Sequence, residues 1–240
     1  MRAQPSRFSR IDIVRASLAA LAAACLLAGA ALAQPANIGD LKPQLLAYQK
    51  SGDYERDLAA VAEKARAYVE ARAGGVARPA LVLDIDETSL SNWPEIKAND
   101  FGYILNGACN RLPKGPCGAG AWELRAEAPV IASTLKLFNA ARAKGVAVFF
   151  ITGRGEDERA ATIRNLRRAG YSGWTRLIMK PVGLKVKSAA DFKAPERAKI
   201  AAQGYTIIAN MGDQPSDLAG GYPDDQSGQF LLPNPFYRIP

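Results

Sequence analysis

The chain has 240 residues, of which 48% are hydrophobic and 22% charged, a composition typical of a medium-sized globular domain and not of a disordered or fibrous protein. Its formal net charge is +8, but no basic block is interleaved with aromatic residues, so a polymeric nucleic acid is not an expected partner.

The N-terminus carries the pattern of an export signal. Four arginines lie before or at the start of an almost uncharged Ala/Leu run at 16–33, which ends in the small-x-small triplet Ala31-Leu32-Ala33. We therefore expect residues 1–33 to be a signal peptide and the protein to be periplasmic or secreted, with no stable membrane insertion after cleavage. A membrane-spanning helix is the alternative, since the run approaches the required ~20 residues. Lipid anchoring at Cys25 is not expected, because the leucine of a lipoprotein signal is missing three residues upstream.

Residues 34–78 are predicted to form an N-terminal helical extension. Apolar residues recur at helical spacing over about 53–73, and Gly74-Gly75 ends the pattern. The remainder, 79–240, alternates short apolar runs with helical patterns. Continuous apolar runs indicate strands covered on both faces, so we expect a three-layer, Rossmann-like α/β domain with a mostly parallel sheet. The predicted strands are 80–83, 146–151, 177–179 and 205–209, and the predicted helices between them are 130–143, 156–169 and 194–202.

Residues 89–126 interrupt this alternation between the first two strands. The segment contains Trp93, Phe101, Tyr103 and Trp122, and its position predicts a small cap over one end of the sheet. These aromatic residues can form a substrate wall or a small satellite core, and the sequence favours neither. The C-terminal segment 232–240, rich in proline, is expected to pack along the domain surface.

Two cysteines lie within the predicted cap. In an exported chain, Cys109 and Cys117 are expected to form a disulfide that closes a short loop and stabilises it by roughly 2–3 kcal/mol. Two free thiols or a metal pair are the alternatives. A metal pair is disfavoured because the chain has no histidine.

Acidic residues follow two of the predicted strands. Asp84 and Asp86 come directly after the first, and Asp213 follows the last. Because open parallel sheets bind ligands beyond the carboxyl ends of their strands, we expect these carboxylates and Thr152 to converge at one edge. Crowded carboxylates repel unless a proton or a cation lies between them, and hard oxygen ligands favour Mg²⁺. Each aspartate has an alternative role as a turn or helix cap, and this alternative applies most strongly to Asp217.

Four motifs at these positions resemble those of the haloacid dehalogenase (HAD) superfamily phosphatases. The resemblance is closer to one branch, the acid phosphatases related to plant vegetative storage proteins and bacterial outer-membrane lipoprotein acid phosphatases, and it covers about 81–220. The motifs are Asp84-x-Asp86-x-Thr88, Ile151-Thr152-Gly153-Arg154 with the residues that follow, a downstream lysine, and Gly212-Asp213-Gln214-Pro215-Ser216-Asp217.

The resemblance implies a role for each matched residue. Asp84 is the nucleophile, and Asp86 is the general acid/base, which also binds the metal through its backbone carbonyl. Thr152, with Gly153 and Arg154, binds the phosphoryl group. The motif lysine is expected to be Lys193, with Lys180 as the alternative. The expected Mg²⁺ ligands are Asp84, Asp86, Asp213 and Asp217.

The expected function is a secreted, Mg²⁺-dependent acid phosphatase that hydrolyses small phosphate monoesters, 5′-nucleotides among them, through an aspartyl-phosphate. A non-catalytic storage or binding protein on the same scaffold is one alternative. A phosphotransferase that passes the phosphoryl group to an alcohol is another. The sequence leaves open whether the chain forms a homo-oligomer.

Overall fold

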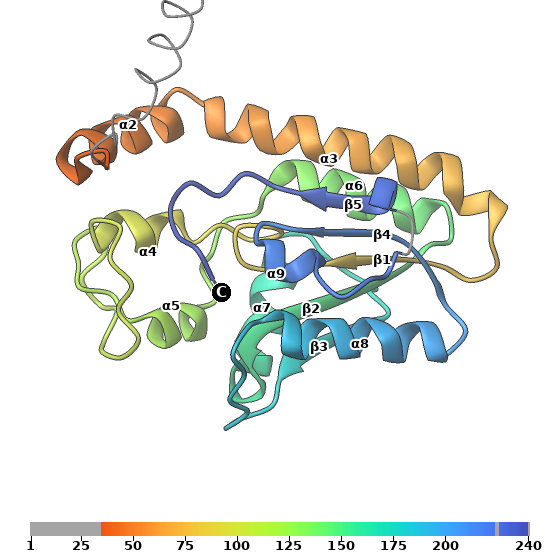
Figure 1. Cartoon of the computed structure of the whole chain (residues 1–240). Coiled ribbons are helices and arrows are strands. Elements are labelled where there is room, and N and C mark those ends of the chain that lie inside the picture. The colour runs from red at the N-terminus through yellow and green to blue at the C-terminus, as the bar shows by residue number, and fades with distance from the viewer. Residues whose placement is uncertain (1–34, 224–225, 240) are drawn as a thin grey trace, which may run out of the picture. The chain divides into compact units, whose positions relative to one another are not determined.

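The computed structural model describes residues 35–223 and 226–239 (Figure 1). The predicted signal peptide lies outside them. No helix in these two ranges is long and apolar enough to cross a membrane. The chain divides into a unit that ends at Leu41, of which only a few residues are described, and a compact unit that begins at Lys42.

A five-stranded parallel sheet forms the centre of this unit, in the order β3-β2-β1-β4-β5. Its strands are β1 (Pro79–Leu83), β2 (Ala147–Gly155), β3 (Arg176–Lys180), β4 (Thr206–Gly212) and β5 (Gln229–Leu231). The first four match the predicted strands. In the register, Leu83 of β1 lies between Phe150 of β2 and Met211 of β4. The loops that follow β1, β2 and β4 therefore start at one edge of the sheet.

Helices cover both faces of the sheet (Figure 1). Alternate strand residues belong to two separate hydrophobic clusters: Leu81 and Leu83 face one, whereas Ala80 and Val82 face the other. The first cluster includes residues of α3 (Asp53–Arg72), α6 (Ala132–Ala143) and α7 (Arg159–Arg168), and the second includes residues of α8 (Ala190–Ala202). The expected three-layer α/β fold is confirmed, because strands buried on both faces need a layer of helices on each.

The segment 89–126 contains two short helices, α4 (Trp93–Ala98) and α5 (Ala119–Arg125), in the same region of Figure 1. Cys109 and Cys117 form the predicted disulfide in the loop between them. Of the four aromatic residues in the segment, Trp122 is buried whereas Tyr103 is 72% exposed. Trp93 and Phe101 pack against the hydrophobic cluster to which Trp122 belongs, so three of the four aromatics contribute to the core.

Three features differ from the expectations. The helical extension contains a further helix, α2 (Ile38–Lys50), before α3. Helix α8 begins at Ala190, four residues before the predicted start, with Pro195 inside it. A short strand that was not predicted, β5, adds to the sheet beside β4, and the C-terminal segment that follows it turns back toward the sheet edge, where Phe236 is buried.

Candidate active site

Four side chains from separate elements meet at the carboxyl edge of the sheet. Asp84 follows β1, Asp213 follows β4, Lys193 lies in the first turn of α8, and Asp217 lies in the short helix α9 (Pro215–Leu218). All four are at least 95% buried. The structure thus brings Asp84 and Asp213 together at one edge of the sheet, and places beside them Lys193 and Asp217, the two residues expected from the family resemblance.

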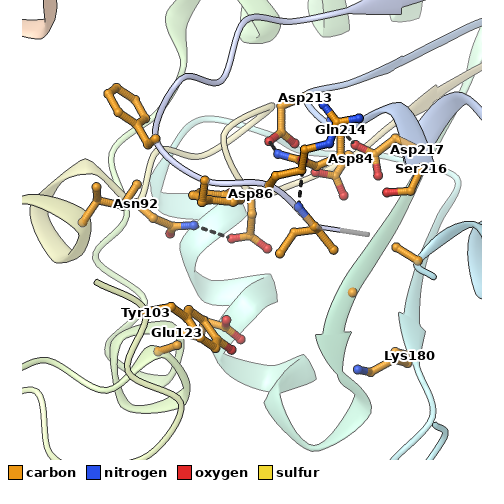
Figure 2. Close-up of a pocket in the computed structure, with 18 of the residues that line it drawn as sticks. Asp84, Asp86, Asn92, Tyr103, Glu123, Lys180, Asp213, Gln214, Ser216 and Asp217 are labelled. Atoms are coloured by element: carbon orange, nitrogen blue, oxygen red, sulfur yellow. Dashed lines mark hydrogen bonds between the residues drawn. The ribbon is translucent and has the colours of Figure 1, made fainter. Parts of the chain in front are cut away.

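Lys193 lies between two carboxylates. Its Nζ is 2.5 Å from Oδ1 of Asp84 and 2.6 Å from Oδ1 of Asp217. Burial lowers the pKa of Lys193, but the two carboxylates outweigh burial and raise it above its usual value. For Asp84, burial raises the pKa well above its ordinary value, although Lys193 opposes this shift. The ammonium group of Lys193 is therefore held in its charged form beside Asp84. Lys180 lies apart from these carboxylates, on another wall of the cavity (Figure 2).

The carboxylate oxygens of Asp84, Asp213 and Asp217 form a potential cation site, with one oxygen of each lying within 4.8 Å of the others. Burial, followed by the charge of Asp217, raises the pKa of Asp213 to about 6. Three buried carboxylates beside one ammonium group leave an excess of negative charge, which suits a divalent cation with oxygen ligands. The donor set therefore fits Mg²⁺. Oδ1 of Asp217 accepts a hydrogen bond from the ammonium group of Lys193, and its Oδ2 accepts one from the backbone N–H of Gln214.

Asp86 points away from this cluster and is bound by two other side chains. Arg154 donates from Nη2 to Oδ1 of Asp86 at 2.6 Å and from Nε to both carboxylate oxygens at 3.1 Å. Asn92 donates from Nδ2 to Oδ1 at 2.9 Å (Figure 2). Burial raises the pKa of Asp86, but the charge and hydrogen bonds of Arg154 outweigh burial and lower it below its usual value.

The residues of β2 that were predicted to bind the phosphoryl group occupy three different environments. Thr152 is fully buried, and its hydroxyl oxygen accepts the backbone N–H of Arg154 at 3.1 Å. Gly153 is exposed and lines the cavity. Arg154 is 3% exposed and directs its guanidinium group to Asp86. Their contacts with a phosphoryl group stay predictions.

A cavity of about 500 Å³ opens beside these residues. Asp84, Asp86 and Lys193 line it, and residues of α4, α5 and the cap loop supply one wall, with Tyr103 and Glu123 in view in Figure 2. The C-terminal segment supplies another, through Phe236, Tyr237, Arg238 and Ile239. The same segment reaches the acidic cluster, because Asn234 Nδ2 donates to Oδ2 of Asp213 at 2.7 Å. Sequence patterns did not indicate this role, since a proline-rich tail carries no periodicity that would predict where it packs.

Glu87 is a further buried acid that the motif analysis missed. It has a left-handed backbone (φ 49°), an uncommon conformation for a residue with a side chain. Its carboxylate accepts a hydrogen bond from the backbone N–H of Asn92 and one from the Tyr54 hydroxyl of α3 at 3.0 Å. Burial raises the pKa of Glu87 to about 8. The N-terminal extension is therefore bonded directly to the loop that carries Asp84 and Asp86.

Comparisons with known proteins agree with this geometry. The sequence model of the HAD superfamily, subfamily IIIB (acid phosphatase), matches residues 30–240. Acid phosphatase 1 of Solanum lycopersicum is 32% identical over 193 residues, which are 80% of this chain and 72% of that protein. Vegetative storage protein 1 of Arabidopsis thaliana is 33% identical over 162 residues, 66% of this chain and 55% of that protein.

Among solved structures, the class C acid phosphatase of Bacillus anthracis has a similar fold. The two superimpose with a TM-score of 0.64 and 24% sequence identity, over 82% of this chain and 86% of that one.

Proposed function

The chain belongs to subfamily IIIB of the HAD superfamily and is a phosphoric monoester hydrolase of that family, and on this premise we propose that it forms an aspartyl-phosphate on Asp84 and depends on Mg²⁺. The observation that carries the proposal is the position of Lys193, whose ammonium group joins Asp84 to Asp217 beside Asp213 in the cavity.

The proposed reaction has two steps. The carboxylate of Asp84 attacks phosphorus, the bond to the leaving oxygen breaks, and Asp86 gives that oxygen a proton. A water molecule then attacks the phosphorus of the aspartyl-phosphate while Asp86 takes a proton from that water. This attack releases inorganic phosphate and restores Asp84. Lys193 neutralises charge on the phosphoryl oxygens during both steps, a contribution that requires the fixed position its two ion pairs provide.

Asp84, Asp213 and Asp217, with the backbone carbonyl of Asp86, are the residues proposed to hold Mg²⁺. Bound there, the cation neutralises negative charge on the phosphoryl group and on the carboxylates that surround it. Without a cation, the burial of these acids raises the pKa of Asp84 and Asp213, which disfavours the ionised nucleophile.

We further propose small phosphate monoesters as substrates, 5′-nucleotides among them, an acidic pH optimum, and export to the periplasm or the medium. The cavity volume of about 500 Å³ accommodates a ligand of nucleotide size. The aromatic residues Phe101, Trp122 and Tyr237 line the cavity and could contact a flat leaving group.

The test is phosphate release from an aryl phosphate by the protein without residues 1–33, in Mg²⁺ or in chelator, beside Asp84→Asn. We expect turnover with Mg²⁺ that falls to background in chelator and in the variant. Turnover that survives in Asp84→Asn would exclude Asp84 as nucleophile. The absence of turnover with any ester, from folded protein with Mg²⁺, would remove the hydrolase function.

That second outcome would favour a storage or binding role, an alternative supported by the similarity to a vegetative storage protein. The buried Asp84–Lys193–Asp217 arrangement argues against it, because burying three charged groups is costly and a storage role does not require them. Added alcohol acceptors would identify a phosphotransferase, through a phosphorylated alcohol formed in place of inorganic phosphate.

A further inference from the structure

The side chain of Asn92 joins the cap to the proposed general acid. Its Nδ2 donates to Oδ1 of Asp86 at 2.9 Å, and its Oδ1 accepts a hydrogen bond from the indole Nε1 of Trp122 at 2.8 Å. Asn92 lies immediately before α4, and Trp122 lies in α5. Both are buried, with exposed fractions of 9% and 3%, and both line the cavity. The three side chains form a continuous chain of hydrogen bonds from the cap to Asp86.

The chemistry of the two neighbours fixes the orientation of this amide. An indole N–H can only donate a hydrogen bond, and Oδ1 of Asp86 accepts one whether or not the other oxygen of the carboxyl group carries a proton. The oxygen of Asn92 must therefore face Trp122, and its NH₂ group must face Asp86. The opposite orientation would place donor against donor and acceptor against acceptor, and both bonds would be lost. Trp122 thus determines which group of Asn92 is presented to the acid.

The carboxyl group of Asp86 is held by hydrogen bonds from two sides. Arg154 binds it from β2, whereas Asn92 binds it from the cap side. The backbone N–H of Asn92 also donates to Glu87, so the asparagine is attached to the loop that carries Asp86. Side chains held by hydrogen bonds in a buried site keep the single orientation that proton transfer requires. The carboxyl group nevertheless remains accessible, because the Asp86 side chain is 24% exposed and lines the cavity.

We propose that Asn92 is a positioning residue for Asp86, and that Trp122 makes the cap part of the catalytic machinery by fixing the Asn92 amide. The inference rests on the proposed function, because it assigns the acid that Asn92 positions. It gives the cap a role in protonating the leaving group, in addition to forming a wall of the cavity.

The consequence depends on the leaving group. When the ester bond breaks, the electron pair stays on the leaving oxygen, which takes its proton from Asp86. An alkoxide is a strong base and needs that proton during bond cleavage, whereas a nitrophenolate is stable without it. Misplacing Asp86 should therefore slow the release of alkyl alcohols far more than the release of activated phenols.

The experiment measures kcat/KM for a series of phosphate monoesters, from p-nitrophenyl phosphate to simple alkyl phosphates, with Mg²⁺ present. This parameter reports the steps up to release of the leaving group. The variants are Trp122→Phe, which keeps a buried ring but removes the N–H, and Asn92→Ala, which removes the amide. The matched control is Trp93→Phe, because Trp93 is a cap tryptophan whose indole makes no hydrogen bond within the described residues and does not line the cavity.

Asn92→Ala should raise the ratio of aryl to alkyl kcat/KM by about tenfold, the effect of losing one hydrogen bond to a charged group, and Trp122→Phe, which frees the amide but keeps it, should raise the ratio by a smaller factor. Trp93→Phe should leave the ratio unchanged. An equal fall for aryl and alkyl esters, or no change in either variant, would overturn the inference while the proposed function stands. A wild-type protein inactive on every ester would remove both.

Discussion

Arg154 binds Asp86 through two of its nitrogens, Nε and Nη2, whereas its third, Nη1, is buried and has no hydrogen-bond partner within the described residues. An arginine beside a general acid favours the ionised form of the acid and so restricts its protonated form to lower pH. This pair offers a physical basis for the proposed acidic optimum, since the first step needs Asp86 protonated.

Arg154→Met should therefore shift the pH profile. Removing the guanidinium charge raises the pKa of Asp86, so the descending limb of kcat/KM on the alkaline side should move to higher pH. Arg159→Met is the matched control, because Arg159 is a neighbouring arginine that pairs with Glu156 and not with Asp86. A profile that stays in place in Arg154→Met would mean that Asp86 does not set that limb.

Lys193 and Lys180 can be separated by the same kind of substitution. Lys193→Met should lower kcat/KM by about 10²–10³-fold, the usual effect of removing one fixed group that stabilises charge in the transition state. Lys180→Met should change it far less, because Lys180 forms no ion pair with Asp84 or Asp217. Equal losses in steady-state assays of the two variants would contradict the assignment of Lys193 as the motif lysine.

For individual residues, the sequence indicated the members of the acidic cluster better than it indicated their hydrogen-bond partners. Asp84, Asp213 and Lys193 follow recognisable strand ends or motifs, so their convergence was predictable. The amide of Asn92 and the hydroxyl of Tyr54 were not, because a buried hydrogen bond between distant segments leaves no local pattern.

Among the elements, α3 is more than a support for the sheet. Tyr54 in its first turn donates to the buried carboxylate of Glu87, and its ring packs edge-on against Phe236 of the C-terminal segment at 4.9 Å between ring centroids. The helix therefore holds two segments that border the active site. The amphipathic pattern predicted this helix but not its contacts, since periodicity shows which face is buried and not what covers it.

Tyr54→Phe should lower the free energy of unfolding by about 1–3 kcal/mol, because it leaves a buried oxygen of the Glu87 carboxyl group without its partner. Tyr48→Phe is the control: its hydroxyl also bonds a carboxylate, that of Asp57, but this pair is exposed and should contribute less than about 0.5 kcal/mol. Urea denaturation of both variants would measure the difference. Equal changes in the free energy of unfolding would show that the buried Glu87 contact contributes no more to stability than the exposed Asp57 contact.

For the molecule as a whole, a pair of acids lies where α5 of the cap contacts the turn between β2 and α7. Glu123 in α5 shares a hydrogen bond with Glu158, which precedes α7. Burial, followed by this hydrogen bond, raises the pKa of Glu123 to about 10. Glu123 therefore binds its proton more tightly in the folded protein than in the unfolded chain. Its contribution to stability is full below a pH of about 4.5 and declines as the pH rises toward about 10.

Glu123→Gln should remove this dependence, because an amide can donate to Glu158 at every pH. The variant should match the wild type near pH 4 and become progressively more stable than it as the pH rises. Denaturation midpoints measured at several pH values would show the effect. A difference that is constant with pH would mean that the pair does not titrate on unfolding.

The architecture was largely readable from the sequence. Four continuous apolar runs fixed the strands β1–β4 and the three layers, because buried parallel strands have a distinctive composition. Strand β5 was missed: it has only three residues, two of them partly buried and one exposed, and such a strand is indistinguishable from a loop in sequence. The return of the C-terminal segment to the site follows from β5 and was missed with it.

If Asp84 carries the phosphoryl group during turnover, that covalent species can be trapped on the enzyme. Enzyme mixed with excess aryl phosphate and Mg²⁺ would be quenched in acid within one turnover, and its peptides analysed by mass spectrometry. We expect a phosphoryl group on Asp84 that hydroxylamine removes, and none in Asp84→Asn. Active enzyme that never carries this modification, or carries it on another residue, would exclude Asp84 as the nucleophile.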